Sequence, residues 1–175
     1  MDFSGLAVNP TNGNVYVCYH QGEFTQPDAF GSGGVYNYSG IYFRRSTDGG
    51  ATWSAQIRVN SDPIATPFDQ FQPGMAVSNS GKIIIVFYDR RNSGVNFNMQ
   101  VFTATSTDGG TTWTNVARTS SFGPLHWQDY FVNDVYMGDY NYPANDRSNA
   151  DTTNFLVPFT SCAAGNQDVL IEKEN

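Results

Sequence analysis

Two nearly identical octets constrain the fold of this chain more than any other feature of its sequence. Residues 46–53 read STDGGATW, and residues 106–113 read STDGGTTW. The octets begin 60 residues apart and differ at one position only. Self-similarity at a fixed spacing indicates a repeat architecture, in which similar units stack against their neighbours. We therefore expect this chain to contain repeated copies of one structural unit.

Each octet has the composition of a tight β-hairpin turn. The Asp-Gly and Gly-Gly pairs allow the positive φ angles that a short turn requires. The Ser and Asp side chains can accept backbone N–H groups inside the turn and hold it in place. Thr and Trp then suit the start of the returning strand, where the indole can wedge between neighbouring sheets.

The pattern Ser-x-Asp-x-Gly-x-Thr-Trp resembles the Asp-box, or BNR repeat, of sialidase-like β-propellers. In that family the box is the hairpin between the third and fourth strands of a blade, on the face opposite the active site. The resemblance implies a structural role, neither catalytic nor metal-binding, for the octet residues. These are Ser46, Asp48, Gly50, Trp53, Ser106, Asp108, Gly110 and Trp113.

The segments around the octets have the pattern of short strands joined by turns. Strands are expected at residues 6–8, 15–20, 40–45, 53–59, 74–77, 82–88, 99–105, 112–118, 140–144, 154–160 and 167–172. Residues 21–40 are rich in Gly, Pro and Ser and are expected to form a long loop. No helix of ordinary length is evident, so the expected fold class is all-β.

Four antiparallel strands per unit correspond to one propeller blade. We expect one domain, residues 1–175, with about three blades at residues 1–60, 61–120 and 121–175, half of a six-bladed sialidase-like propeller. Three blades are too few for the roughly 4–8 that close a ring. The chain is therefore expected to be a fragment of a longer propeller, or to close the ring with a second copy of itself.

Composition excludes several classes of partner. The 175 residues carry a net charge of -7, and only 14% of them are charged. An acidic chain is not expected to bind nucleic acid, which requires basic patches. No apolar stretch approaches the roughly 20 residues of a membrane span. Cys18 and Cys162 are read as two buried thiols or as a disulfide, and the sequence leaves both readings open.

Strand parity brings the loops opposite the octets together on one face of the propeller. They carry Asp69, Asp89, Arg90, Arg91, His126, Trp127, Asp129, Asp139 and Tyr140. Guanidinium groups bind carboxylates, aromatic rings stack on sugars, and an acid protonates a leaving oxygen. We predict catalytic roles for Asp89, Asp139 and Tyr140. We predict substrate binding by Asp69, Arg90, Arg91 and Trp127. The alternative is that these groups only pair with neighbouring loops.

The catalytic machinery of sialidases does not carry over as a whole. That family uses three arginines on the substrate carboxylate, a Tyr nucleophile with a Glu partner, and an Asp acid/base. Its Phe-Arg-Ile-Pro segment is absent here, and the three glutamates, Glu23, Glu172 and Glu174, follow no motif of the family. Two functions stay open. One is an exo-acting glycoside hydrolase on sialic-acid-type or other acidic glycans, and the other is a non-catalytic propeller that binds a glycan or a protein.

The resemblance also leads to expectations about cofactors, partners and location. No cofactor and no metal are expected. Residues 146–151 offer oxygen ligands for calcium as an alternative, but lack the glycine and terminal glutamate of an EF-hand loop. The expected partner is a glycan or glycoprotein. Asp-box propellers are frequently secreted, so an extracellular or cell-surface location is expected.

Overall fold

The computed structural model describes residues 4–27, 34–94, 96–123, 141–146, 154–161 and 168–174. Within these residues every element is a β-strand, and all strand pairs are antiparallel. The all-β prediction is therefore confirmed. No helix in this part of the chain is long and apolar enough to cross a membrane.

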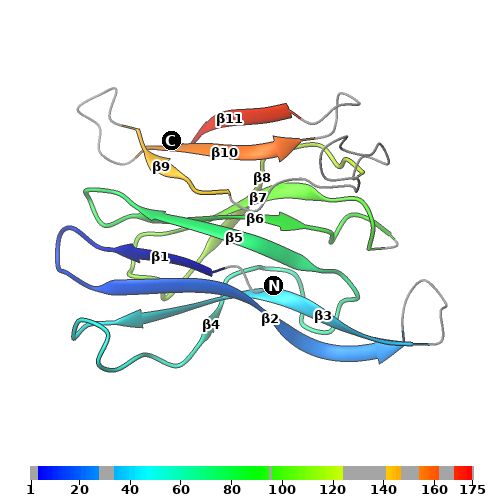
Figure 1. Cartoon of the computed structure of the whole chain (residues 1–175), viewed down its shortest axis with the longest axis horizontal. Coiled ribbons are helices and arrows are strands. Elements are labelled where there is room, and N and C mark those ends of the chain that lie inside the picture. The colour runs from blue at the N-terminus through cyan, green and yellow to red at the C-terminus, as the bar shows by residue number, and fades with distance from the viewer. Residues whose placement is uncertain are drawn as a thin grey trace, which may run out of the picture.

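The strands form three sheets in which consecutive strands are neighbours. The first sheet contains β1 (Ser4–Val8), β2 (Val15–Pro27), β3 (Val35–Ser46) and β4 (Ile57–Arg58). The second contains β5 (Gln70–Val77), β6 (Ile83–Asp89), β7 (Gln100–Ser106) and β8 (Thr114–Ala117). The third contains β9 (Ala144–Asn145), β10 (Phe155–Ser161) and β11 (Asp168–Glu174). Figure 1 shows the three sheets stacked face to face, with the second in the middle.

Two apolar cores hold the stack together, and β6 contributes to both. Side chains at alternate positions of a strand point to opposite faces. Ile83, Ile85 and Phe87 accordingly belong to the core between the first and second sheets. Ile84, Val86 and Tyr88 pack instead with Phe155, Val157 and Phe159 of the third sheet. The described part of the chain thus shows three stacked sheets but no closed ring.

Both octets form hydrogen-bonded turns, as their sequences predict. In the first, Ser46 Oγ accepts the Gly50 N–H at 2.8 Å and donates to Asp48 Oδ1 at 2.7 Å. The other carboxylate oxygen of Asp48 accepts the Thr52 hydroxyl at 2.6 Å. The second octet repeats these contacts through Ser106, Asp108 and Thr112. These side chains are committed to the turn itself.

The second octet also closes the seam between the first and second sheets. The Trp113 ring packs edge-on against Phe43 of β3, with 5.1 Å between the centroids. Gly110, at φ +85°, lies so close to Phe43 that a Cβ atom would overlap the ring. Arg45 Nη1 donates to the Gly109 carbonyl at 3.1 Å. The repeated motif is therefore a packing device between sheets as well as a turn.

The prediction of a loop at residues 21–40 is wrong for most of this segment. β2 continues to Pro27 and β3 begins at Val35, so that these parts of the two strands form a two-stranded ribbon. The ribbon is paired from Gln21↔Gly40 to Pro27↔Val35, with a bulge at Glu23. Cross-strand aromatic pairs stabilise such a ribbon, and Phe24 stacks on Tyr38 with 5.3 Å between centroids. Gly22 fits crowding within the ribbon, since a Cβ atom there would overlap the Asn37 side chain.

Cys18 lies in the core between the first two sheets as a free thiol. Burial raises its pKa to about 12, so the thiol stays protonated. Cys162 lies outside the described residues.

Replacing Gly110 by alanine is expected to destabilise the fold by about 2–3 kcal/mol, because the new methyl group must displace Phe43 in addition to adopting a left-handed backbone. Gly49→Ala is the matched control, since Gly49 has φ +71° and a Cβ atom there would meet nothing within 4 Å. Gly49→Ala should lower the free energy of unfolding by about 1 kcal/mol. Urea unfolding midpoints measure both. Equal losses would contradict the packing role of Gly110.

Acid should weaken the octet turns through their aspartates. Hydrogen bonds from the Thr52 hydroxyl and N–H, with the Ser46 hydroxyl, lower the pKa of Asp48 from 3.8 to about 2. A carboxyl group with a lower pKa in the folded state stabilises the fold above its unfolded pKa. This contribution is lost as pH falls from about 4 through 2. The stability difference between wild type and Asp48→Asn should therefore shrink over that window in urea titrations. A stability difference that stays constant over this pH range would show that the ionised Asp48 carboxylate does not stabilise the turn.

Candidate functional site

A cavity of about 430 Å³ opens at the end of the stack opposite the octets. The octet end is identified by the β1–β2 turn, the β5–β6 turn and the second octet, which border one common polar hollow. The cavity instead lies where β2 and β3 extend beside the start of β5 and the end of β6, and we call it the Asp69 cavity. Its lining residues are His20, Gln21, Gly22, Tyr36, Asn37, Ser39, Asp69, Phe71 and Arg90.

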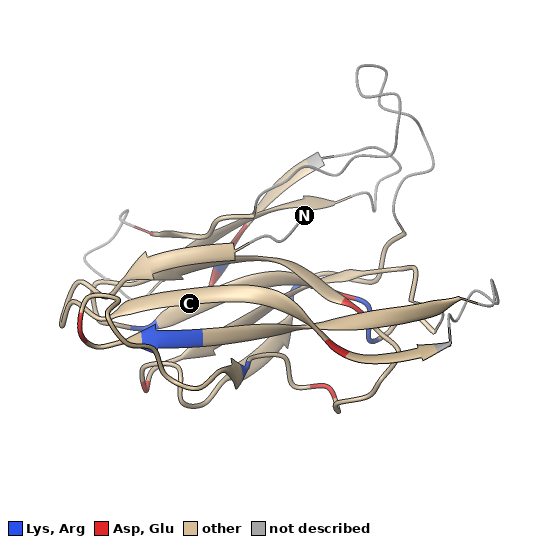
Figure 2. Ribbon diagram, turned by 60° about the horizontal axis from the view of Figure 1, so that its bottom comes forward, with Lys and Arg blue, Asp and Glu red and all other residues tan. Residues whose placement is uncertain are grey.

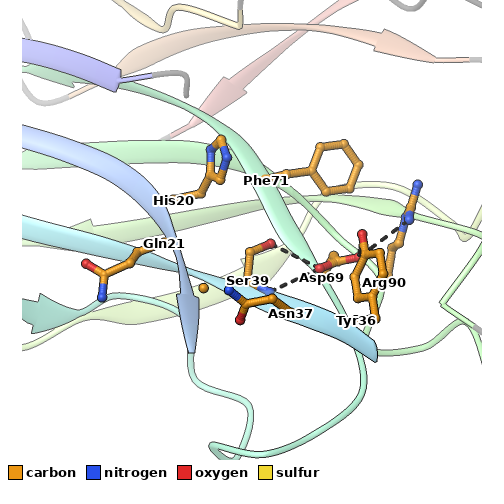
Figure 3. A pocket seen from close by; sticks show the side chains of 9 residues that line it. His20, Gln21, Tyr36, Asn37, Ser39, Asp69, Phe71 and Arg90 are labelled. Atoms are coloured by element: carbon orange, nitrogen blue, oxygen red, sulfur yellow. Dashed lines mark hydrogen bonds and ion pairs between the residues drawn. The ribbon is translucent and has the colours of Figure 1, made fainter. Parts of the chain in front are cut away.

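Asp69 joins the two sheets at the base of this cavity (Figure 3). Its Oδ1 accepts the Ser39 N–H at 3.0 Å and the Ser39 hydroxyl at 3.1 Å. Its Oδ2 accepts the Tyr36 hydroxyl at 3.0 Å and the Asn96 amide at 2.7 Å. The carboxylate is almost fully buried. A carboxylate that accepts this many hydrogen bonds is held in a fixed position, which suits an organising group.

Asn96 is the residue that allows this arrangement on the side of the second sheet. It adopts φ +53°, a conformation that asparagine tolerates better than most residues. From there its side chain also accepts the Asp69 N–H at 2.8 Å. One buried amide thus binds both the backbone and the side chain of Asp69.

Arg90 forms one wall of the cavity. Its guanidinium lies 4.9 Å from the Phe71 ring centroid, and Nη1 donates to the Asn96 carbonyl at 3.1 Å. Nη1 also lies 3.7 Å from Asp69 Oδ2. Burial lowers the pKa of Arg90, against the opposite effect of Asp69, yet an arginine remains cationic in proteins. Its buried Nε has no hydrogen-bond partner among the described residues, and the side chain as a whole is 23% exposed.

Tyr36 presents an aromatic ring and a fixed hydroxyl beside Arg90. The ring packs against Tyr38 at 4.9 Å between centroids, and 40% of the residue stays exposed. Burial and the nearby Asp69 charge raise the pKa of Tyr36. The hydroxyl therefore remains a phenol that donates to Asp69, and forming a nucleophilic phenolate there is unfavourable.

A separate chain of ion pairs lies next to the cavity and contains Asp89 and Arg91. Arg91 binds Asp89 at 2.6 Å and Asp62 at 3.3 Å, and Asp62 also accepts from Arg58 at 3.2 Å. Arg58 in turn binds Glu23, the residue at the ribbon bulge. Burial raises the pKa of Asp89, although Arg91 opposes this shift. With its side chain wholly buried, Asp89 anchors the β6 end and does not line the cavity.

The structure thus brings together two of the predicted site residues, Asp69 and Arg90. It places Asp89 and Arg91 in the adjoining ion-pair chain. The predicted residues Asp139, Tyr140 and Trp127 lie outside the described residues, as do His126 and Asp129. Their roles stay predictions.

Sequence reasoning missed the contribution of the β2–β3 ribbon to this site. Gln21, Tyr36 and Asn37 line the cavity from strands that were expected to be a loop. The alternation of Tyr36 and Tyr38 is a period-two pattern that could have indicated a strand. Asn96 offered no comparable signal, because its role depends on a positive φ angle and a partner 27 residues away.

In the described part of the chain, no group of three or more His, Cys, Asp or Glu side chains gathers. Of the calcium alternative at residues 146–151, only Asp146 is described. Its carboxylate accepts Lys173 Nζ at 2.7 Å.

No family model and no curated protein matches this sequence. Two solved structures are similar in fold. The Hadza microbial sialidase Hz136 is 13% identical with a TM-score of 0.59, over 97% of this chain and 30% of that chain. A protein of unknown function from Dyadobacter fermentans DSM 18053 is 17% identical with a TM-score of 0.55, over 97% of this chain and 50% of that chain. This chain is therefore similar in fold to a part of each of these structures and spans half or less of their length.

Asn96→Ala should destabilise the protein by about 2–3 kcal/mol, because it removes two buried hydrogen bonds and leaves the Asp69 N–H unpaired. Asn92→Ala is the matched control, since Asn92 is exposed and bonds only to Gln100 among the contacts described. It should change stability by about 0.5 kcal/mol or less. Urea unfolding measures both. Comparable losses would show that Asn96 does not hold Asp69.

Proposed function

We propose that this chain forms part of a sialidase-like propeller and that the Asp69 cavity binds a sugar of a glycan. The fold supports the first part, because stacked sheets of four antiparallel strands are the blades of propellers. The observation that carries the second part is the cavity itself, on the face opposite the octets. Its volume of about 430 Å³ is in the range of small-molecule sites.

The lining of the cavity has the chemistry that a sugar requires. Tyr36 and Phe71 offer aromatic surface for the apolar C–H faces of a sugar ring. Gln21 and Asn37 offer amides that donate to and accept from hydroxyl groups. Arg90 lines the cavity with a side chain that is 23% exposed, and its guanidinium can donate to a sugar hydroxyl or carboxylate. Acidic glycans would bind through this guanidinium.

The described geometry favours binding over hydrolysis. Glycoside hydrolysis usually needs two carboxyl groups that flank the scissile bond. Asp69 already accepts hydrogen bonds from several donors, and Asp89 is buried against Arg91, so neither carboxylate is free to act on a scissile bond. The raised pKa of Tyr36 disfavours a phenolate nucleophile. These groups position the cavity wall and do not supply a reacting atom.

Hydrolysis is the second candidate, supported by the fold shared with a sialidase and by the predicted residues Asp139 and Tyr140. If the protein hydrolyses a fluorogenic sialoside and the Arg90→Ala variant does not, hydrolysis replaces binding as the proposed function. In either case we infer a location outside the cell or on its surface, with a glycan or glycoprotein as partner. The low charged fraction of 14% supports this location.

Tyr36→Ala is expected to weaken glycan binding about tenfold, because the aromatic contact and the hydroxyl bound to Asp69 are both removed. Tyr142→Ala is the matched control, since this tyrosine is exposed away from the cavity, and its affinity should equal that of wild type. A glycan array selects the ligand, and calorimetry measures the affinities. The proposal fails if wild type retains no glycan or if both variants bind equally.

A further inference from the structure

His20 brings to the Asp69 cavity a side chain whose charge can change near neutral pH. It lies on β2, where alternate residues face the same side of the sheet. Tyr16 and Cys18 point into the core between the first and second sheets, so His20, two positions further on, points the same way. At this position that side of β2 reaches the cavity, and the imidazole helps to line it (Figure 3).

The imidazole lies at the edge of the core and not in open solvent. His20 pairs with Ile41 of β3 in the register of the first sheet and is half-buried. Ile41 is fully buried. A charge at such a place is screened less than a charge on the open surface, because the protein interior borders it on one side. A proton on His20 therefore acts across the cavity.

Two groups of opposite charge already line the cavity and offset each other. Arg90 Nη1 lies 3.7 Å from Asp69 Oδ2, and an arginine stays cationic in proteins. Tyr36 adds no charge near neutral pH, because burial and the nearby Asp69 raise its pKa. While His20 is neutral, the charges of the lining cancel. An acidic sugar then gains little net attraction over a neutral one.

The elements packed around His20 bring no further charge to the cavity from their described residues. β1 and β5 contain no titratable side chain. Glu23 of the ribbon is bound by Arg58, and Asp89, whose pKa burial raises, is bound by Arg91. The other titratable side chains of β3, none of which lines the cavity, are Tyr38, Tyr42, Arg44 and Arg45. Charged residues are sparse along the strands as a whole (Figure 2).

We propose, on the basis of the proposed function, that His20 determines which sugars the Asp69 cavity prefers. With a neutral imidazole the cavity does not distinguish acidic from neutral sugars, and with a protonated imidazole it favours acidic ones. Histidine changes its charge between about pH 5 and 8. A sugar carboxylate stays anionic over this range, because carboxyl groups titrate near pH 4. It then meets two cations, Arg90 and His20, against the one carboxylate of Asp69.

The same charge change requires that binding takes up protons. A ligand that prefers the protonated imidazole raises the affinity of the imidazole for its proton by the same factor. In the pH range where the imidazole is mostly neutral, an acidic sugar therefore draws a proton from the buffer as it binds. A neutral sugar should bind without proton uptake. Proton uptake thus distinguishes a charged contact from a side chain that only shapes the cavity.

A glycan array probed at about pH 5.5 and about pH 8 tests the choice of sugar. It carries uronic-acid and sialic-acid glycans beside the same glycans with the carboxylate reduced to a hydroxymethyl group. Acidic glycans should be retained about tenfold more strongly at the lower pH, since one added charge acts at short range. The reduced glycans should change little.

The outcomes of the array separate this inference from the proposed function. Equal retention of acidic glycans at both pH values, or retention of neutral glycans alone, overturns the role of His20 and leaves sugar binding standing. If no glycan is retained at either pH, both proposals fail.

Two variants assign the effect to one of the two histidines in the sequence. His20→Gln keeps a polar side chain that stays neutral, so its affinity for an acidic glycan should be the same at both pH values. In His126→Gln the tenfold rise should persist. Calorimetry in two buffers of different ionisation enthalpy should show proton uptake by wild type and none by His20→Gln. A rise that persists in His20→Gln, or a wild type that takes up no proton, overturns the proposal. Thermal melts at both pH values establish that the variants are folded.

Discussion

The burial of β6 on both of its faces is the constraint on which the rest of the structure depends. Each large apolar side chain removed from water contributes about 1.5–3 kcal/mol, and β6 is buried from Ile83 to Asp89. A strand of this kind needs a sheet on each side, so the first and third sheets are required by the second. The second octet then fixes the spacing between the first and second sheets, because Trp113 and Gly110 fit around Phe43. β2 and β3 of the first sheet extend past the cores and, with the start of β5 and the end of β6, form the Asp69 cavity.

The fold class could be predicted because its signals are local and repeated. The two octets specify a turn through their own side chains, and the apolar run at residues 82–88 indicates a strand buried on both sides. The β2–β3 ribbon could not be predicted in the same way. Its glycines and serines favour a loop by composition, whereas its stability comes from contacts between strands, such as Phe24 on Tyr38. Gly40 illustrates the difference, since it makes room for the Glu23 side chain across the ribbon.

The candidate site was predictable only in part for a related reason. Strand parity indicated correctly that Asp69 and Arg90 share one end of the stack. Strand parity could not tell which of these side chains line the cavity and which are buried beside it. Asp89 and Arg90 are adjacent in sequence, but their side chains point to opposite sides of the strand end, one into the ion-pair chain and one into the cavity wall. Side-chain direction at the end of a strand depends on the neighbouring loops, here on the left-handed turn at Asn96.

The cavity draws its walls from two sheets, and this division couples ligand binding to the seam between them. Tyr36 and Asn37 belong to the first sheet, whereas Phe71 and Arg90 belong to the second. Asp69 already crosses the seam through its bonds to Tyr36 and Ser39. A ligand that touches both walls binds only when the sheets are in register, so its binding free energy adds to the free energy of holding them together. By the same linkage, any change that loosens the seam lowers affinity without touching the ligand.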